Sequence, residues 1–93
     1  MSTSSAIIYL KAEQNVELQS PDVYVKDIGK LTCSDSHILA KVKAIKLLHF
    51  NKDGEKRQVI SILKVIEEIA RVCPGVNVEN LGESDILVEY IDV

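Results

Sequence analysis

Apolar residues recur at spacings of three and four between Ser61 and Gly75, which is the period of an α-helix with one buried face. Ser61 is placed to cap the first turn, because its hydroxyl can accept a hydrogen bond from an otherwise unpaired backbone amide. Pro74 and Gly75 end the pattern, since proline lacks an amide and clashes with the preceding turn. The sequence therefore predicts a helix from Ser61 to Cys73, whose buried stripe consists of Ile62, Leu63, Ile66, Ile69, Ala70 and Cys73.

Two valines of this helix, Val65 and Val72, are apolar but lie off the stripe. They are seven residues apart and therefore on one side of the helix. Two explanations stay open at this point. Either the helix lies deeply between a sheet and another helix, or these valines form a second apolar face that contacts another subunit. Val65 and Val72 are accordingly the interface residues that the sequence proposes.

Short apolar runs elsewhere in the chain predict strands. A second periodic segment predicts a helix over 36–43, capped by Ser34 or Asp35. Polar breakers interrupt the chain between Gln14 and Pro21, and residues 27–29 are expected to form a turn or a single helical turn. The predicted strands are 7–12, 23–25, 45–50, 56–60, 76–79 and 86–91.

The Asp53–Gly54 pair is a turn signal that predicts a hairpin between strands 45–50 and 56–60. The alternative is a second helix that begins earlier, near Lys56, because Val59 also falls on its stripe. With the hairpin, the order is strand, strand, helix, strand, strand, helix, strand, strand. This order predicts an α+β sandwich with two helices on one face of a mixed or antiparallel sheet.

Composition is consistent with one small domain covering residues 1–93. Hydrophobic residues make up 46% of the chain and aromatic residues only 4%, so the core must be aliphatic. The net charge of −3 argues against a strong nucleic-acid binder, which needs a clustered excess of lysine and arginine. A solvated surface is the common explanation for the basic residues, and a local patch is the alternative, formed by Lys41, Lys43, Lys46, Lys52, Lys56 and Arg57.

No residue pattern predicts catalysis, a metal site or a cofactor. His37 and His49 are not next to an evident nucleophile, and we expect both to be structural or exposed. Cys33 and Cys73 lack metal-ligand spacing, so we expect two reduced thiols with Cys73 facing the core. A disulfide between them is the alternative. We therefore expect that this domain is not an enzyme.

Four segments carry a resemblance to a known family. They are VYVKDIGKLTCSD (23–35), KVKAIKLL (41–48), VISILKVIEEI (59–69) and LGESDILVEYI (81–91). Together they resemble the N-terminal soluble domain of the stage V sporulation protein AA family of endospore-forming bacteria. The resemblance covers most of the chain, but its motifs are patterns of sequence rather than a catalytic signature.

This resemblance implies a longer protein that continues into membrane-spanning helices at the spore inner membrane. No run of this chain approaches the ~20 apolar residues of a membrane helix, so the domain itself is expected to be soluble. The family implies a role in a membrane complex that moves dipicolinic acid, with calcium, into the developing spore and releases it on germination. The expected function is a non-catalytic interaction or assembly domain, whose partners are other subunits of the stage V sporulation A complex or further copies of itself. The family supplies no catalytic or ligand residues to carry over.

Two other functions stay open. A dipicolinate sensor would need basic donors for two carboxylates, which Lys41, Lys43 and Arg57 could supply if they converge. The element order also resembles ring-building domains and KH-like domains. A KH-like nucleic-acid binder is the less favoured of these, because the chain is acidic and has no GxxG loop.

Overall fold

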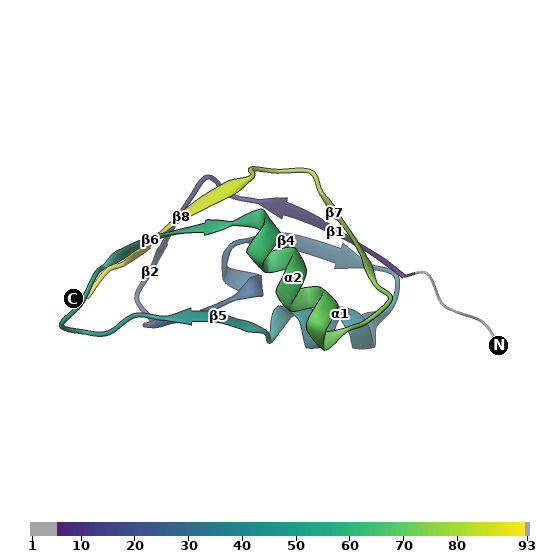
Figure 1. The fold of residues 1–93 in the computed structure, drawn as a ribbon, viewed down its shortest axis with the longest axis horizontal. Coiled ribbons are helices and arrows are strands. Elements are labelled where there is room, and N and C mark those ends of the chain that lie inside the picture. Colours follow the sequence, from purple (N-terminus) through teal and green to yellow (C-terminus); the bar gives the residue numbers. More distant parts are fainter. Residues whose placement is uncertain (1–5, 93) are drawn as a thin grey trace.

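Three small sheets and two α-helices form the fold (Figure 1). The computed structural model describes residues 6–92. The strands are β1 (Ile7–Ala12), β2 (Asn15–Leu18), β3 (Asp22–Tyr24), β4 (Gly29–Cys33), β5 (Lys46–His49), β6 (Arg57–Ser61), β7 (Asn77–Asn80) and β8 (Asp85–Tyr90). The helices are α1 (Ser36–Lys43), α2 (Ile62–Val72) and the short 3-10 helix η1 (Val25–Asp27).

The sheets separate the strands into two mixed groups of three and one antiparallel pair. Sheet A has the order β4-β1-β7, with β1 antiparallel to β4 and parallel to β7. Sheet B has the order β2-β8-β6, with β8 parallel to β2 and antiparallel to β6. Sheet C pairs β3 with β5. The predicted α+β class is confirmed, but the single sheet is replaced by three, and the likeness to ring-building or KH-like domains stays a prediction.

The predicted hairpin is wrong, although its turn forms. The Gly54 amide donates to the Asn51 carbonyl at 3.1 Å, as expected of a tight turn. The strands on either side then diverge, because β5 pairs with β3 and β6 pairs with β8. The alternative of a helix from Lys56 is also wrong, since Arg57–Ser61 is a strand. A turn signal fixes the bend of the chain, but the partner of each strand is decided by packing.

Both helices begin at the caps that the sequence predicts. Asp35 accepts hydrogen bonds from the amides of His37 and Ile38 at 2.9 and 3.2 Å, which satisfies the first turn of α1. Ser61 does the same for α2 by accepting from the Leu63 amide at 3.2 Å. The α2 helix ends before Pro74, and Gly75 adopts φ +88°, a conformation that favours glycine.

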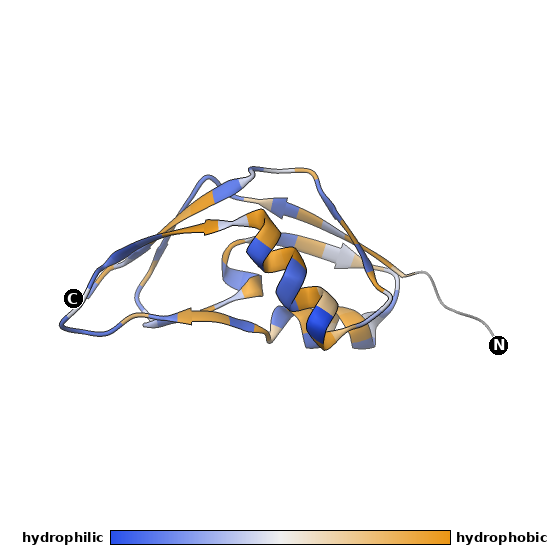
Figure 2. Cartoon of the chain, in the orientation of Figure 1, coloured by the Kyte–Doolittle hydropathy of each residue, from blue (hydrophilic) through white to orange (hydrophobic). Residues whose placement is uncertain are grey.

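The buried face of α2 differs from the predicted stripe. Figure 2 shows that hydrophobic and hydrophilic residues alternate along this helix. Val65 is fully buried with 0% exposure, whereas Leu63 is 68% exposed. The buried residues Ile62, Val65, Ile69 and Cys73 follow the helical spacing, so the stripe is rotated toward Val65. Val65 is therefore a core residue and the proposed interface of Val65 with Val72 is corrected: only Val72, 39% exposed, reaches the surface.

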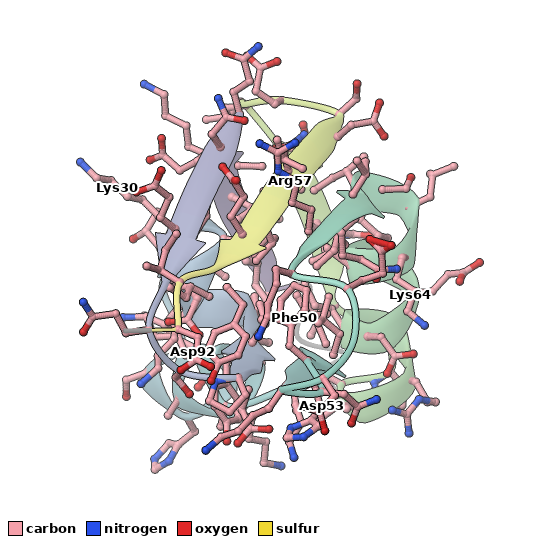
Figure 3. The ribbon with its side chains drawn as sticks, turned by 90° about the vertical axis from the view of Figure 1, so that its left-hand side faces the viewer. Lys30, Phe50, Asp53, Arg57, Lys64 and Asp92 are labelled. Atoms are coloured by element: carbon pink, nitrogen blue, oxygen red, sulfur yellow. The ribbon has the colours of Figure 1, made fainter. Side chains whose placement is uncertain are left out.

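The core is aliphatic and lies between the sheets and the helices. Phe50 and Tyr90 stack at 5.8 Å between ring centroids where sheets B and C come together, and Figure 3 shows Phe50 at the centre of this end of the molecule. Cys73 is buried, as expected, Cys33 is half-buried, and the two residues are not bonded to each other. The fully buried side chains are Ile8, Leu10, Val23, Val25, Ile28, Val42, Val65, Ile69, Ile86 and Val88.

Two glycines, one on each side, pack closely against the backbone at the end of β1. A Cβ on Gly29 would lie 2.4 Å from the Lys11 carbonyl oxygen, and a Cβ on Gly82 would lie 2.3 Å from the Ala12 carbonyl oxygen. No side chain fits at such distances, so both positions require glycine for the close approach of two backbones. The backbone at the end of β1 is therefore tightly enclosed.

Candidate interaction surface

The titratable residues that the sequence singled out do not assemble into a reactive centre. Within residues 6–92, no group of three or more His, Cys, Asp and Glu side chains is arranged to hold a metal ion. His37 lies in the first turn of α1 and His49 in β5. The buried side-chain polar atoms of the described chain all have hydrogen-bond partners.

His49 takes part in an exposed cluster of polar side chains that joins the two strands of sheet C. Its Nδ1 atom lies 2.6 Å from Asp22 Oδ1, and the Lys46 ammonium lies 3.4 Å from the same oxygen. The hydrogen bond with His49, followed by the charge and hydrogen bond of Lys46, lowers the pKa of Asp22 below its ordinary value of 3.8. This cluster supports the β3–β5 pair and contains no nucleophile.

The six basic residues considered as a patch are spread over several elements. Arg57 on β6 binds Glu89 on β8 at 2.9 Å, and Lys56 lies 3.7 Å from Asp92. Lys56 also lies 5.1 Å from the centre of the Tyr90 ring. Lys41 and Lys43 belong to the last turn of α1, at the other end of the molecule from β6 (Figure 1). Lys41, Lys43 and Arg57 thus do not converge on one ligand.

Lys43 instead lines a shallow depression beside Tyr24. This depression has a volume of about 340 Å³ and is lined by Lys26 and Lys43 together with Tyr24, Ala40 of α1 and Ala44, the residue that follows α1. The Lys26 ammonium lies 5.9 Å from the centre of the Tyr24 ring. Two ammonium groups that line one depression can bind carboxylates, and the tyrosine ring in the same lining can stack on a planar ligand.

Two strongly exposed apolar side chains lie where β6 meets α2. Val59 is 60% exposed on β6 and Leu63 is 68% exposed in the first turn of α2. Beside them a groove of about 260 Å³ separates β6 from β5. We call this region the β6 surface, and its members are Leu47, Leu48, Gln58, Val59, Leu63 and Lys64.

A second apolar region lies on the outer face of sheet A. Tyr9 on β1 is 42% exposed, and Leu81, just after β7, is 67% exposed. They line a depression of about 170 Å³ together with Leu31, Lys11 and Lys30. We call this the sheet A surface. Figure 3 shows Lys30 and Lys64 on opposite sides of the molecule, so the two surfaces face in different directions.

Sequence reasoning missed both surfaces and placed the interface on α2 instead. The available signal was strand alternation: Val59 follows Gln58 and precedes the core residue Ile60, so Val59 must point away from the core in an extended strand. Tyr9 stands between the core residues Ile8 and Leu10 in the same way. The alternation reveals outward side chains, but not which of them remain uncovered.

The described residues thus form a small α+β domain with exposed apolar side chains in two separate regions. The comparison of sequences then identifies it: residues 5–93 match the stage V sporulation protein AA family, and the chain belongs to that family. No curated protein matches the chain.

A solved structure agrees closely with this fold. The crystal structure of a functionally unknown protein from Eubacterium ventriosum ATCC 27560 is 35% identical, and the match covers 96% of this chain and 97% of that one. Its TM-score of 0.89 means that the two chains share the fold over nearly their whole length. In residues 6–92, neither α-helix is long and apolar enough to cross a membrane.

Proposed function

We propose that this domain is a non-catalytic interaction domain of the spore membrane complex that carries dipicolinic acid, with calcium, into the developing spore and releases it on germination. Membership of the stage V sporulation protein AA family supports the cellular setting. The observation that carries the molecular role is the exposure of large apolar side chains, above all Leu63 and Leu81, on two separate faces of a small domain. Apolar patches of this kind characterise surfaces that other proteins cover.

The proposed partners are other subunits of the stage V sporulation A complex. The parent protein is held at the spore inner membrane through segments outside these 93 residues, and the domain contacts its partners from there. Two surfaces on opposite sides allow one domain to contact two neighbours at once. Dipicolinate, in this proposal, passes through the membrane parts of the complex, while the domain holds the parts together.

The experiment is co-purification of the complex from sporulating cells that carry Leu81→Lys in the full-length protein. A lysine on the sheet A surface places a charge in the contact, so we expect loss of partner subunits from the purified complex and lower dipicolinate in the spores. Ala70→Lys is the matched control, since Ala70 is an exposed position of α2 outside both surfaces. Unchanged subunit recovery for Leu81→Lys and also for Leu63→Lys would refute the proposal.

A second candidate function is direct binding of dipicolinate in the depression beside Tyr24. The favouring observation is that Lys26 and Lys43 border one aromatic ring, which matches a planar ring with two carboxylates. Calorimetric titration with calcium dipicolinate is expected to give heat that falls in Lys26→Ala and Lys43→Ala. The absence of heat with the unmodified domain would refute dipicolinate binding, but it would not bear on the proposed interaction function.

A further inference from the structure

Strand β6 has one free backbone edge, which follows from its pairing with β8. The Tyr90 amide donates to the Lys56 carbonyl at 2.8 Å, and the Ile62 amide donates to the Ser84 carbonyl at the same distance. In an antiparallel ladder such pairs alternate, so the backbone groups of the even-numbered residues between them point toward β8. The amides of Arg57, Val59 and Ser61, and the carbonyls of Arg57 and Val59, therefore point away from β8.

Nothing among residues 6–92 pairs with this edge. Sheet B ends at β6, and the neighbouring strand β5 belongs to sheet C. A groove of about 260 Å³ is lined by residues of both strands. Proteins usually protect such edges with proline, a bulge or an inward-pointing charge. The β6 register is regular from Arg57 to Ser61, and the strand contains no proline.

From this edge we infer that β6 pairs with β6 of a second copy of the chain, antiparallel and about a two-fold axis at Val59. This inference deepens the proposed function and rests on it, because it names one contact of the assembly domain. Each Val59 then lies opposite the other Val59, and each Arg57 lies opposite Ser61 of the second copy. Two three-stranded sheets become one six-stranded sheet with the order β2-β8-β6-β6-β8-β2.

The apolar side chains on the outer face match this arrangement. Val59 lies directly across from Leu87, so each copy carries an apolar pair in one row of the sheet. Pairing about Val59 joins the two rows into a continuous line of four apolar side chains. The contact covers Val59, which in the single chain is exposed on both its face and its edge.

The charges also complement one another across the two-fold axis. Ser61 lies opposite Asp85 within one chain, so Arg57 of one copy shares a row with Asp85 of the other. Arg57 would then have acidic groups on both sides, Glu89 in its own chain at 2.9 Å and Asp85 beyond the new strand pair. This pattern of opposite charges favours a second copy over an unrelated strand.

Disulfide trapping of Val59→Cys in a Cys33→Ser background tests the contact directly. Opposed residues of a hydrogen-bonded pair have Cα atoms about 5.5 Å apart, within the range that a disulfide spans. We expect rapid oxidation to a covalent dimer. Leu81→Cys is the matched control, because Leu81 is equally exposed but lies on the sheet A surface. Equal trapping at Leu81→Cys, or none at Val59→Cys, would overturn the inference.

Sedimentation equilibrium of the unmodified chain supplies the second readout. We expect reversible dimers in the micromolar to millimolar range, and a dissociation constant at least about tenfold higher for Val59→Lys. A chain that stays monomeric at millimolar concentration would overturn the inference, as would a Val59→Lys variant that dimerises equally well.

The two levels of the proposal fail separately in these experiments. If the chain is monomeric but the complex keeps its other subunits, only the β6–β6 contact is refuted. The free edge of β6 would then be available to another protein. If the chain dimerises but no other subunit of the complex is recovered with it, the wider proposed function is refuted and the β6–β6 contact is not.

Discussion

Strands β1 and β6 both present an apolar side chain on their outer face, yet their backbones are in different situations. β1 is the centre of sheet A and bonds to β4 and β7, whereas β6 is an edge and bonds only to β8. A partner can therefore meet Tyr9 only through the face of the sheet, but it can meet Val59 through both face and edge. The kind of contact that an exposed apolar residue can make depends on the backbone groups beside it.

The largest expected effect tests how firmly β1 is enclosed. In Gly82→Ala the new Cβ would lie 2.3 Å from the Ala12 carbonyl oxygen, which the backbone of β1 cannot relieve. We expect a loss of about 4 kcal/mol or more in the free energy of unfolding, enough to unfold a small domain. Thermal unfolding followed by circular dichroism measures it.

Gly54→Ala is the control for this substitution. Its Cβ would meet only Asn51, at 3.4 Å from the Cβ and 3.8 Å from the carbonyl oxygen, so the free energy of unfolding should stay within about 0.5 kcal/mol of that of the original chain. Equal stability of the Gly82 and Gly54 variants would contradict the close backbone approach at β1.

Proline substitution distinguishes β1, which has a neighbouring strand on both sides, from β6, which has one on only one side. Tyr9 lies across from Thr32 of β4, and the bond from the Glu13 amide to the Ile28 carbonyl sets the alternation that makes this pair hydrogen-bonded. Tyr9→Pro should therefore cost about 3 kcal/mol or more. Val59→Pro removes an amide that points outward, so its cost should be about 1 kcal/mol or less.

Chemical denaturation measures both variants, and Gln58→Pro supplies the comparison within β6. The Gln58 amide points toward β8, so Gln58→Pro should be as costly as Tyr9→Pro. If Val59→Pro proves as damaging as Gln58→Pro, the edge of β6 is not free.

A smaller effect is expected where β7 leaves sheet A beside β1. The Asn80 side chain accepts from the Gly82 amide at 3.1 Å and donates to the Glu83 carbonyl at 2.7 Å, which fixes the turn against Ala12. Asn80→Ala should lower the free energy of unfolding by about 1–2 kcal/mol, seen as a lower urea midpoint. Asn77→Ala, at an exposed position of β7, should leave the midpoint unchanged; a matching decrease there would contradict the role of the Asn80 turn.

The smallest effect concerns the hydrogen bond between Asp22 on β3 and His49 on β5. The His49 hydrogen bond lowers the pKa of Asp22, so the pair stabilises the fold above the ordinary pKa of 3.8 and loses this contribution as pH falls through the lowered value. Asp22→Asn should be slightly less stable than the original chain at pH 6. The difference should shrink as the pH is lowered below 3.8. Thermal unfolding at several pH values checks it, and a difference that grows in acid would contradict the sign.

The sequence predicted those elements that depend on residues close to one another in the chain. The caps Asp35 and Ser61, the extent of both helices and the strand 7–12 all follow from residues within one or two turns. Strands β2 and β4 were missed, because each is a short segment with few apolar residues that becomes a strand by pairing with β8 or β1. Their cause lies far away in the chain.

The candidate surfaces could not be predicted for a related reason. The helical period alone fits both Leu63 and Val65 to a stripe, and only the position of the sheets decides that Val65 is buried. In the same way, the Asp53–Gly54 turn predicts a bend but not that β5 pairs with β3. The free edge of β6 exists because of that choice of partner.

The parallel pairs of sheets A and B join early strands to late ones. β1 lies beside β7 and β2 beside β8, so residues about seventy positions apart must meet before either sheet is complete. Such a topology folds slowly for its size, since the chain entropy of closing these loops is lost before the contacts form. During synthesis, β1 cannot complete sheet A until the strand Asn77–Asn80 has left the ribosome, and β2 cannot complete sheet B until Asp85–Tyr90 has done so. Until then the free edges of the unfinished sheets are exposed, and chaperones would meet this domain at that stage.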